Sequence, residues 1–211
     1  MKLGLIGYGD AGRAVAAGLR EEGTAPEICA WSRSLGKSVV PDENGVTYAG
    51  SRRELVERSD VIFVMVPGSA AVECAGETAP FLNENKLYVD LTTAAPRDMR
   101  TVEAIVSETG AGFADGAMMD TVPKFRHKVP MTLCGKDADR AEKIMTGLGM
   151  EVTNLGSEPG RADAVKLLRS MYTKAHLACV FEMLEAAERY GVADFVMEDL
   201  AKTMDGKTVK S

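Results

Sequence analysis

The stretch LGLIGYGDAGRAVAAGL, residues 3–19, decides the fold, because an apolar strand pattern passes into a helical pattern across three glycines. In the order G-x-G-x-x-G, the first glycine permits a tight turn, the second lets the backbone approach a phosphate, and the third lets helix pack on strand. The helix N-terminus then offers amides and a positive dipole to phosphates. The pattern is weak alone, but as the first element of a strand–helix–strand unit it predicts a dinucleotide-binding turn. The expected cofactor contacts in it are Gly7, Tyr8, Gly9, Asp10, Ala11 and Gly12.

Beyond this turn, short β-rich runs alternate with helical patterns as far as residue 156, which predicts an α/β fold with a doubly wound, mostly parallel sheet. Strands are expected at 2–6, 27–31, 46–48, 61–66, 86–91, 112–117, 129–134 and 151–154. Helices are expected at 11–22, 51–58, 70–82, 96–108 and 137–148. Ser51 and Glu54 form a capping-box pattern at the start of the second helix.

After Gly156 the strand patterns stop, and helical spacing predicts one long helix from about 158 to 190 and a shorter one over 193–204. We therefore expect a Rossmann-type nucleotide domain over 1–156 and a small all-α domain over 157–211. A helix of roughly thirty residues cannot bury its apolar stripe on so small a remainder. This favours a homodimer formed through the C-terminal helices.

The composition sets limits on partners and location. The chain has 211 residues, 45% of them hydrophobic, and a formal net charge of −6. A basic stripe for nucleic acid and a long apolar run for a membrane are both missing from the sequence, so we expect neither partner and a cytoplasmic location. Cys29, Cys74, Cys134 and Cys179 have no metal-binding or redox spacing. They are expected to be buried thiols, and no metal site is expected.

The end of the second expected strand reads Trp31-Ser32-Arg33-Ser34, where an NAD-selective site would usually place an acid. A guanidinium between two hydroxyls suits a 2′-phosphate, so Ser32, Arg33 and Ser34 favour NADP, with NAD as the alternative if Arg33 is only a solvated strand-end residue. Further contacts with the cofactor are expected from Val66 and Pro67, because the end of the fourth strand lies beside the nicotinamide end of the crevice.

Four motifs in order resemble the β-hydroxyacid dehydrogenase superfamily, which includes 6-phosphogluconate dehydrogenase. They are GLIGYGDAG at 4–12, DVIFVMVP at 60–67, VDLTTAAP at 89–96 and GRADAVKLLRS at 160–170. The last resembles a smaller branch with a C-terminal domain of unassigned function. For this superfamily the helical part after Gly156 is short, so it is expected to be pared down or truncated.

The resemblance implies roles for particular residues. It makes Lys166 the general acid and base that exchanges a proton with the substrate hydroxyl while hydride passes to the nicotinamide. It makes Thr93 and Ser170 further catalytic residues and Thr92 a cofactor contact, although a threonine pair is also ordinary strand chemistry.

The resemblance also implies a substrate site. The substrate-binding set is Thr93, Met118, Met119, Arg169 and Lys174. The two cations suit a small anionic substrate, and Lys174 is equally well explained as a solvated helix residue. The family's usual D-A-P-V-S-G-G stretch, whose Ser-Gly-Gly backbone receives the substrate carboxylate, appears here as Asp115-Gly116-Ala117-Met118-Met119-Asp120. This loop has lost its small residues and gained an acid, which puts recognition of a simple 3-hydroxycarboxylate in doubt.

The leading hypothesis is an NADP-dependent oxidoreductase that transfers hydride between the nicotinamide and a small hydroxy acid. One alternative is an imine, enamine or carbonyl reductase built on the same scaffold. Another is a catalytically silent NADP-binding protein.

Overall fold

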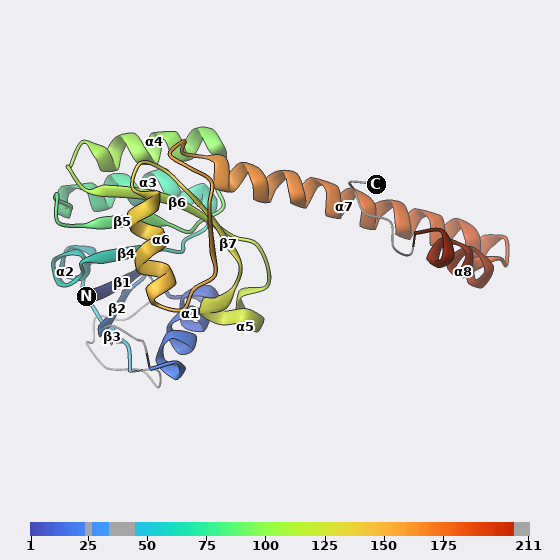
Figure 1. Cartoon of the computed structure of the whole chain (residues 1–211), viewed down its shortest axis with the longest axis horizontal. Helices are drawn as coiled ribbons and strands as arrows, with labels where there is room; N and C mark the ends of the chain where they lie inside the picture. Colours follow the sequence, from blue (N-terminus) through green and yellow to red (C-terminus); the bar gives the residue numbers. More distant parts are fainter. Residues whose placement is uncertain (24–26, 34–44, 205–211) are drawn as a thin grey trace. The chain divides into compact units, whose positions relative to one another are not determined.

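The chain forms two compact units, residues 1–166 and residues 167–211 (Figure 1). The structure is a computed structural model that describes residues 1–23, 27–33 and 45–204. Ser34, one of the expected cofactor contacts, lies outside the described residues.

The first unit is built on one eight-stranded sheet in the order β3-β2-β1-β4-β5-β6-β7-β8. Its strands are β1 (Lys2–Ile6), β2 (Glu27–Trp31), β3 (Thr47–Tyr48), β4 (Val61–Val64), β5 (Leu87–Asp90), β6 (Gly112–Met118), β7 (Met131–Cys134) and β8 (Val152–Asn154). All neighbouring strands are parallel except β6 and β7, which pair antiparallel. The predicted doubly wound, mostly parallel α/β fold is confirmed.

Helices cover both faces of the sheet (Figure 1). They are α1 (Asp10–Glu21), α2 (Arg52–Arg58), α3 (Ala71–Thr78), α4 (Pro96–Ser107), α5 (Val122–Phe125) and α6 (Ala138–Gly147). One core contains buried side chains of α1 and α6, and the other contains those of α2, α3 and α4. Since β4, β5 and β6 are buried along their whole length, their sequences are apolar except for Asp90 and Asp115, rather than alternating between apolar and polar residues.

The chain reverses its direction of winding between β1 and β4, which are neighbours in the sheet although two strands separate them in sequence. In doubly wound sheets a crevice opens at this position, outside the carboxyl ends of the strands. The glycine-rich turn follows β1, and the segment from Met65 to Pro67 follows β4. The topology therefore brings two of the expected cofactor-binding segments to one place.

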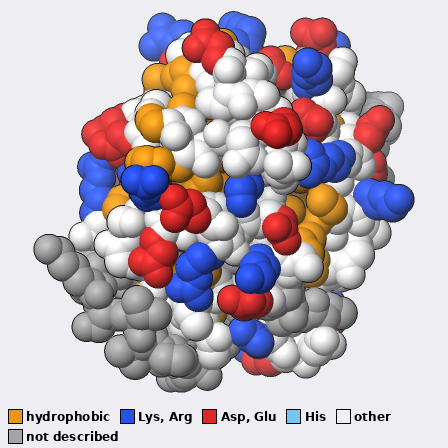
Figure 2. All heavy atoms as spheres, turned by 90° about the vertical axis from the view of Figure 1, so that its left-hand side faces the viewer, with side chains coloured by type: hydrophobic (Ala, Val, Ile, Leu, Met, Phe, Trp, Pro, Cys, Tyr) orange, Lys and Arg blue, Asp and Glu red, His pale blue; other side chains and the backbone are white. Residues whose placement is uncertain are grey.

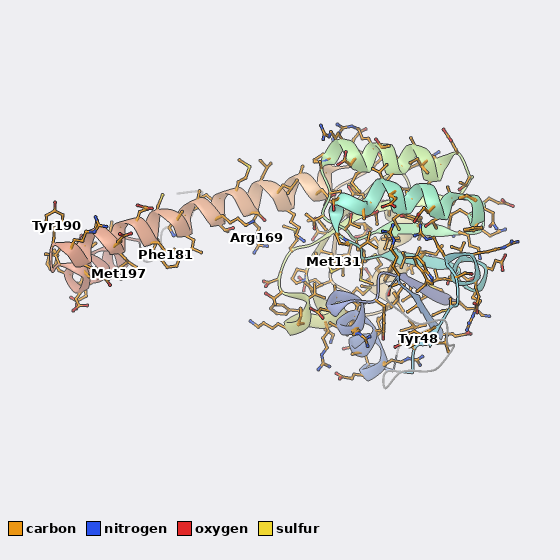
Figure 3. The ribbon with its side chains drawn as sticks, turned by 180° about the vertical axis from the view of Figure 1, so that it is seen from behind. Tyr48, Met131, Arg169, Phe181, Tyr190 and Met197 are labelled. Carbon is orange, nitrogen blue, oxygen red and sulfur yellow. The ribbon has the colours of Figure 1, made fainter. Side chains whose placement is uncertain are left out.

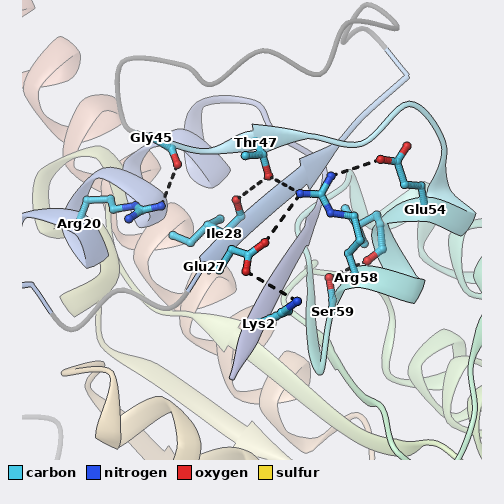
Figure 4. Close-up of polar contacts among 10 residues, drawn as sticks. Lys2, Arg20, Glu27, Ile28, Gly45, Thr47, Glu54, Arg58 and Ser59 are labelled. Carbon is cyan, nitrogen blue, oxygen red and sulfur yellow. Dashed lines mark hydrogen bonds and ion pairs between the residues drawn. The ribbon is translucent and has the colours of Figure 1, made fainter.

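Polar contacts fix the edge of the sheet beside β2 (Figure 4). The Arg58 guanidinium donates to the Thr47 hydroxyl at 3.1 Å and to the Glu54 carboxylate at 3.2 Å. The Thr47 hydroxyl in turn donates to the carbonyl oxygen of Ile28 at 3.3 Å. This chain of contacts joins α2 to β3 and β2, and thereby supports the strand that ends at Trp31.

The second unit consists of most of α7 (Arg161–Arg189) together with α8 (Ala193–Met204). Many of its large apolar side chains are exposed, among them Leu168, Met171 and Phe181 at 65%, 68% and 63%. Figure 3 shows Phe181 on α7 and Met197 on α8. By contrast, the face of the first unit in Figure 2 carries interspersed acidic and basic side chains.

Some helices and strands end at other residues than expected, for local reasons. The expected strand over 61–66 ends at Val64, because Met65 and Val66 leave the sheet. The expected helix over 70–82 is a short α-helix between two 3-10 turns, and Pro80 in the second turn lacks an amide to continue the helix.

The strand expected over 112–117 extends to Met118, so most of the stretch that resembles the family's carboxylate loop belongs to β6. The short helix α5 was not anticipated. Cys179 is exposed on α7, whereas Cys29, Cys74 and Cys134 are buried as expected. No helix among the described residues is long and apolar enough to cross a membrane.

Candidate active site

A pocket of about 370 Å³ opens where β1, β2 and β4 end. Seven of the residues that line it were expected to bind the cofactor: Gly7, Tyr8, Gly9, Ser32, Arg33, Val66 and Pro67. Trp31, Arg52, Met65, Ala70 and Cys74 complete the wall. Asp10, Ala11 and Gly12 lie just behind it, in the first turn of α1.

The three glycines of the turn have three different surroundings. Gly7 has φ +92°, and a Cβ there would lie 2.4 Å from the Met65 carbonyl oxygen. A Cβ on Gly12 would lie 2.6 Å from the Gly7 carbonyl oxygen, which explains the close packing of α1 on the turn. A Cβ on Gly9 would meet nothing within 4 Å. Gly9 therefore faces open space at the pocket, where the backbone can approach a ligand.

These surroundings fit the pyrophosphate of a dinucleotide. Gly9 is the N-cap of α1, and no side chain of the described residues caps that helix. The first amides of α1 are thus available to an anion, and the helix dipole favours negative charge there.

Arg33 lies at the end of β2 and lines the pocket, but acidic side chains surround it. Its guanidinium is 2.9 Å from Glu73 and 3.7 Å from Glu77, both on α3. Glu73, as the nearer partner, raises the pKa of Arg33 most, so the guanidinium is charged. An acid at this end of the pocket is therefore present after all, although it comes from α3 and not from β2.

Lys166 lies in the second turn of α7 and reaches the loop that follows β5. Its Nζ donates a hydrogen bond of 2.8 Å to Oγ1 of Thr93. Burial lowers the pKa of the Lys166 ammonium, and the carboxylate of Asp163 opposes this shift. The structure therefore brings together two of the three residues expected to be catalytic.

This lysine site adjoins the pocket through Gly68. A Cβ on Gly68 would lie 2.1 Å from the carbonyl oxygen of Thr93, so the backbones of the two loops touch. Because Pro67 lines the pocket directly before Gly68, the Thr93–Lys166 pair borders the Met65–Pro67 side of the pocket. This is the side expected to hold the nicotinamide.

Two buried aspartates hold the start of α7 against the first unit's sheet and loops through hydrogen bonds. Asp115 on β6 accepts a hydrogen bond of 2.7 Å from the Gly160 amide and one of 3.1 Å from the Cys134 thiol. Asp163 accepts one of 3.2 Å from the Ala94 amide, next to Thr93. The position of Lys166 therefore depends on contacts made three and six residues before it.

The acids also interact with one another. Asp90 and Asp115 are direct neighbours in the register of β5 and β6, and both are fully buried. Burial raises the pKa of Asp90 to about 7. It raises the pKa of Asp163 to about 8, where the charges of Asp115 and Asp90 add to the shift. Carboxyls this close cannot all ionise without cost, so protons are shared among them near neutral pH.

Sequence reasoning missed these three aspartates and Arg52. A signal for two of them was visible, because Asp90 and Asp115 interrupt runs that are otherwise apolar strand. Asp163 precedes Lys166 by three residues and so shares its helix face. Arg52 is only 8% exposed although it begins a polar helix, and nothing in its sequence context indicates burial.

The remaining expected residues have different surroundings. Thr92 is buried, and its amide donates to Asp90 at 2.9 Å. Met118 ends β6 in the hydrophobic core, and Met119 follows it with its sulfur 3.7 Å from the Thr132 hydroxyl. Arg169, Ser170 and Lys174 belong to the second unit, so their roles stay predictions.

Comparison with known proteins assigns most of the chain to a family. Residues 2–156 match the family described as the NAD binding domain of 6-phosphogluconate dehydrogenase. The mitochondrial 3-hydroxyisobutyrate dehydrogenase of Drosophila melanogaster is 22% identical over 97% of this chain and 64% of its own length. An NADPH-dependent reductive aminase of Aspergillus oryzae is 28% identical over 81% of this chain and 59% of its own length. This chain thus spans less than two thirds of either relative.

Among solved structures, one similar protein is a conserved protein described as structurally similar to 3-hydroxyacid dehydrogenases. It is 27% identical, with a TM-score of 0.82, and the match covers 98% of this chain and 77% of that one.

Proposed function

Since the chain belongs to the family of the NAD binding domain of 6-phosphogluconate dehydrogenase, we propose that it is an NADP-dependent oxidoreductase that transfers hydride between the nicotinamide and a small hydroxy acid. The hydrogen bond of 2.8 Å between Lys166 and Thr93, next to the glycine-lined pocket, carries the proposal. It supplies a half-buried amine for proton transfer at the side of the pocket where hydride would be exchanged.

Different residues bind the cofactor and transfer the proton. Gly9 and the first amides of α1 hold the pyrophosphate, and Arg33 with Ser32 holds the 2′-phosphate. A bound nicotinamide supplies the acceptor or donor of hydride. The neutral amine of Lys166 takes the proton of the substrate hydroxyl in oxidation, and its ammonium returns the proton in reduction. Thr93 orients the amine, and burial favours its neutral form by lowering the pKa.

The test is turnover by wild type and by Lys166→Ala, followed through the absorbance of reduced nicotinamide with a panel of small hydroxy acids and NADP. We expect Lys166→Ala to lower kcat by about 10²- to 10⁴-fold, the usual contribution of a general base, with nucleotide affinity unchanged. Lys143→Ala on α6 is the matched control, because that lysine is exposed on another part of the first unit. Unchanged turnover in Lys166→Ala would contradict the role of Lys166 as general acid and base.

A second candidate is reduction of imines formed from a carbonyl compound and an amine, which the similarity to a reductive aminase favours. A second panel, of ketone and amine mixtures with NADPH, separates the two candidates. An imine reductase would still oxidise NADPH in Lys166→Ala and would oxidise no alcohol in the first panel. Nucleotide binding without turnover in either assay, and without any effect of Lys166→Ala, would indicate a silent NADP-binding protein.

We also propose that Arg169 and Lys174 hold the anionic part of the substrate, in line with their charge, and that Ser170, one helical turn after Lys166, is a further catalytic residue. We further propose a homodimer formed through the second unit, supported by its exposed apolar side chains. A cytoplasmic location is supported by four cysteines that are free thiols.

A further inference from the structure

Two arginines in the wall of the pocket form ion pairs with two glutamates of α3. Arg33 is 2.9 Å from Glu73 and 3.7 Å from Glu77, and Arg52 is 2.5 Å from Glu77. The two acids are four residues apart on α3 and so share one face of that helix. Both arginines line the pocket, and the two glutamates contact them from beside its wall.

Of the two arginines, Arg52 has the side chain that is held in place by burial and by several contacts. Its guanidinium is almost fully buried, lies 4.7 Å from the centre of the Trp31 ring, and donates to the Cys74 carbonyl at 2.9 Å. Glu77 balances that buried charge and is therefore committed to Arg52. Glu73 and Arg33 are different, because their side chains are 56% and 65% exposed. Their pair can open when a ligand arrives.

The ligand that would open this pair is the adenosine ribose of the cofactor. In NADP the ribose carries a 2′-phosphate of charge near −2, which attracts Arg33 but meets Glu73 beside it. In NAD the same position carries a hydroxyl, which can donate a hydrogen bond to a carboxylate. Glu73 therefore opposes the phosphate and accepts the hydroxyl, whereas Arg33 favours the phosphate.

We propose that Glu73 is a specificity-determining residue that weakens the preference for NADP given by Arg33, so that the chain binds both NADP and NAD. This inference rests on the proposed function, because it assumes that the pocket holds a nicotinamide dinucleotide. It explains why the pocket has both Arg33 of β2, which favours NADP, and Glu73 of α3, which favours NAD.

The test uses 2′,5′-ADP and 5′-AMP as probes, since they differ only in the 2′-phosphate. Affinities are measured by calorimetry on the full chain and followed by the fluorescence of Trp31, the single tryptophan, which lines the pocket. The variants are Glu73→Gln, Arg33→Gln and the double variant. Glu57→Gln is the matched control. It also removes one acid from an exposed ion pair, with Arg53 at 2.8 Å, but that arginine does not line the pocket.

In wild type we expect both probes to bind. Glu73→Gln should raise the ratio of affinities for 2′,5′-ADP over 5′-AMP by about twofold to fivefold, the size of one exposed ion pair. Arg33→Gln should lower that ratio below the wild-type value, the double variant should bring it back toward one, and Glu57→Gln should leave it unchanged. An unchanged or lower ratio in Glu73→Gln overturns the role of Glu73 and leaves the proposed function intact. Failure of both probes and of both intact nucleotides to bind overturns the two together.

Discussion

Single residues at the start of α7 show how the fold prepares one lysine for proton transfer. Lys166 is held by Thr93, and the loop that carries Thr93 is held by Asp163 through the Ala94 amide. Asp163 also stabilises the charged form of Lys166, so the same carboxyl both positions the amine and opposes the loss of its proton. Placement and pKa are therefore coupled in this site.

The buried carboxyl of Asp90 predicts a dependence of stability on pH. Burial raises its pKa from 3.8 to about 7, so between these values the folded state binds more protons than the unfolded state. The free energy of unfolding must then fall as pH rises across this window. Asp90→Asn removes the titration and keeps an acceptor for the Thr92 amide, so we expect it to gain stability over wild type as pH rises from 5 to 8. Thermal unfolding at several pH values measures this, and parallel curves for the two proteins would contradict it.

At the scale of elements, the docking of α7 depends on one backbone position. Gly160 has φ +87°, and a Cβ there would lie 2.7 Å from the carbonyl oxygen of Pro96 at the start of α4. We expect Gly160→Ala to destabilise the first unit by about 1–3 kcal/mol in urea unfolding, the cost of a strained backbone position.

The matched control is Gly76→Ala within α3, where a Cβ would meet nothing within 4 Å. That substitution should stabilise the protein by about 0.5–1 kcal/mol, because alanine is the better helix former. Equal effects of the two substitutions would show that Gly160 has no special role in docking α7.

The elements themselves were largely predictable where local signals are strong. β1, β2 and α8 have the expected bounds, and the Ser51 hydroxyl caps α2 by accepting from the Glu54 amide at 3.1 Å, as the capping box predicts. α5 was missed because its four residues are too few to show a helical period. The described helices of seven or more residues were all anticipated, because each is long enough to show a helical period.

At the scale of the whole molecule, the second unit leaves apolar surface uncovered in a single chain. Leu168, Met171 and Phe181 are each more than 60% exposed. Burial of such side chains is the main favourable term in association, so we expect light scattering at micromolar concentration to give a mass near twice 22.5 kDa.

Phe181→Glu should shift that mass toward a single chain, because it places a charge in the proposed interface. Glu188→Gln, a change at an exposed acid of the same helix, should not. A single-chain mass for the wild type at these concentrations would count against the dimer.

The sequence by itself determined the α/β fold, the family and the position of the glycine-rich turn, because these follow from local patterns: apolar runs, glycines at fixed spacing and caps. Only the tertiary structure decided which residues share a site. It brought Glu73 of α3 to Arg33 of β2 and Asp163 of α7 to the loop after β5, and it aligned Asp90 with Asp115 across two strands. The physical reason is that charge and proton affinity depend on burial and on neighbours far away in sequence, which strand order and helix docking set.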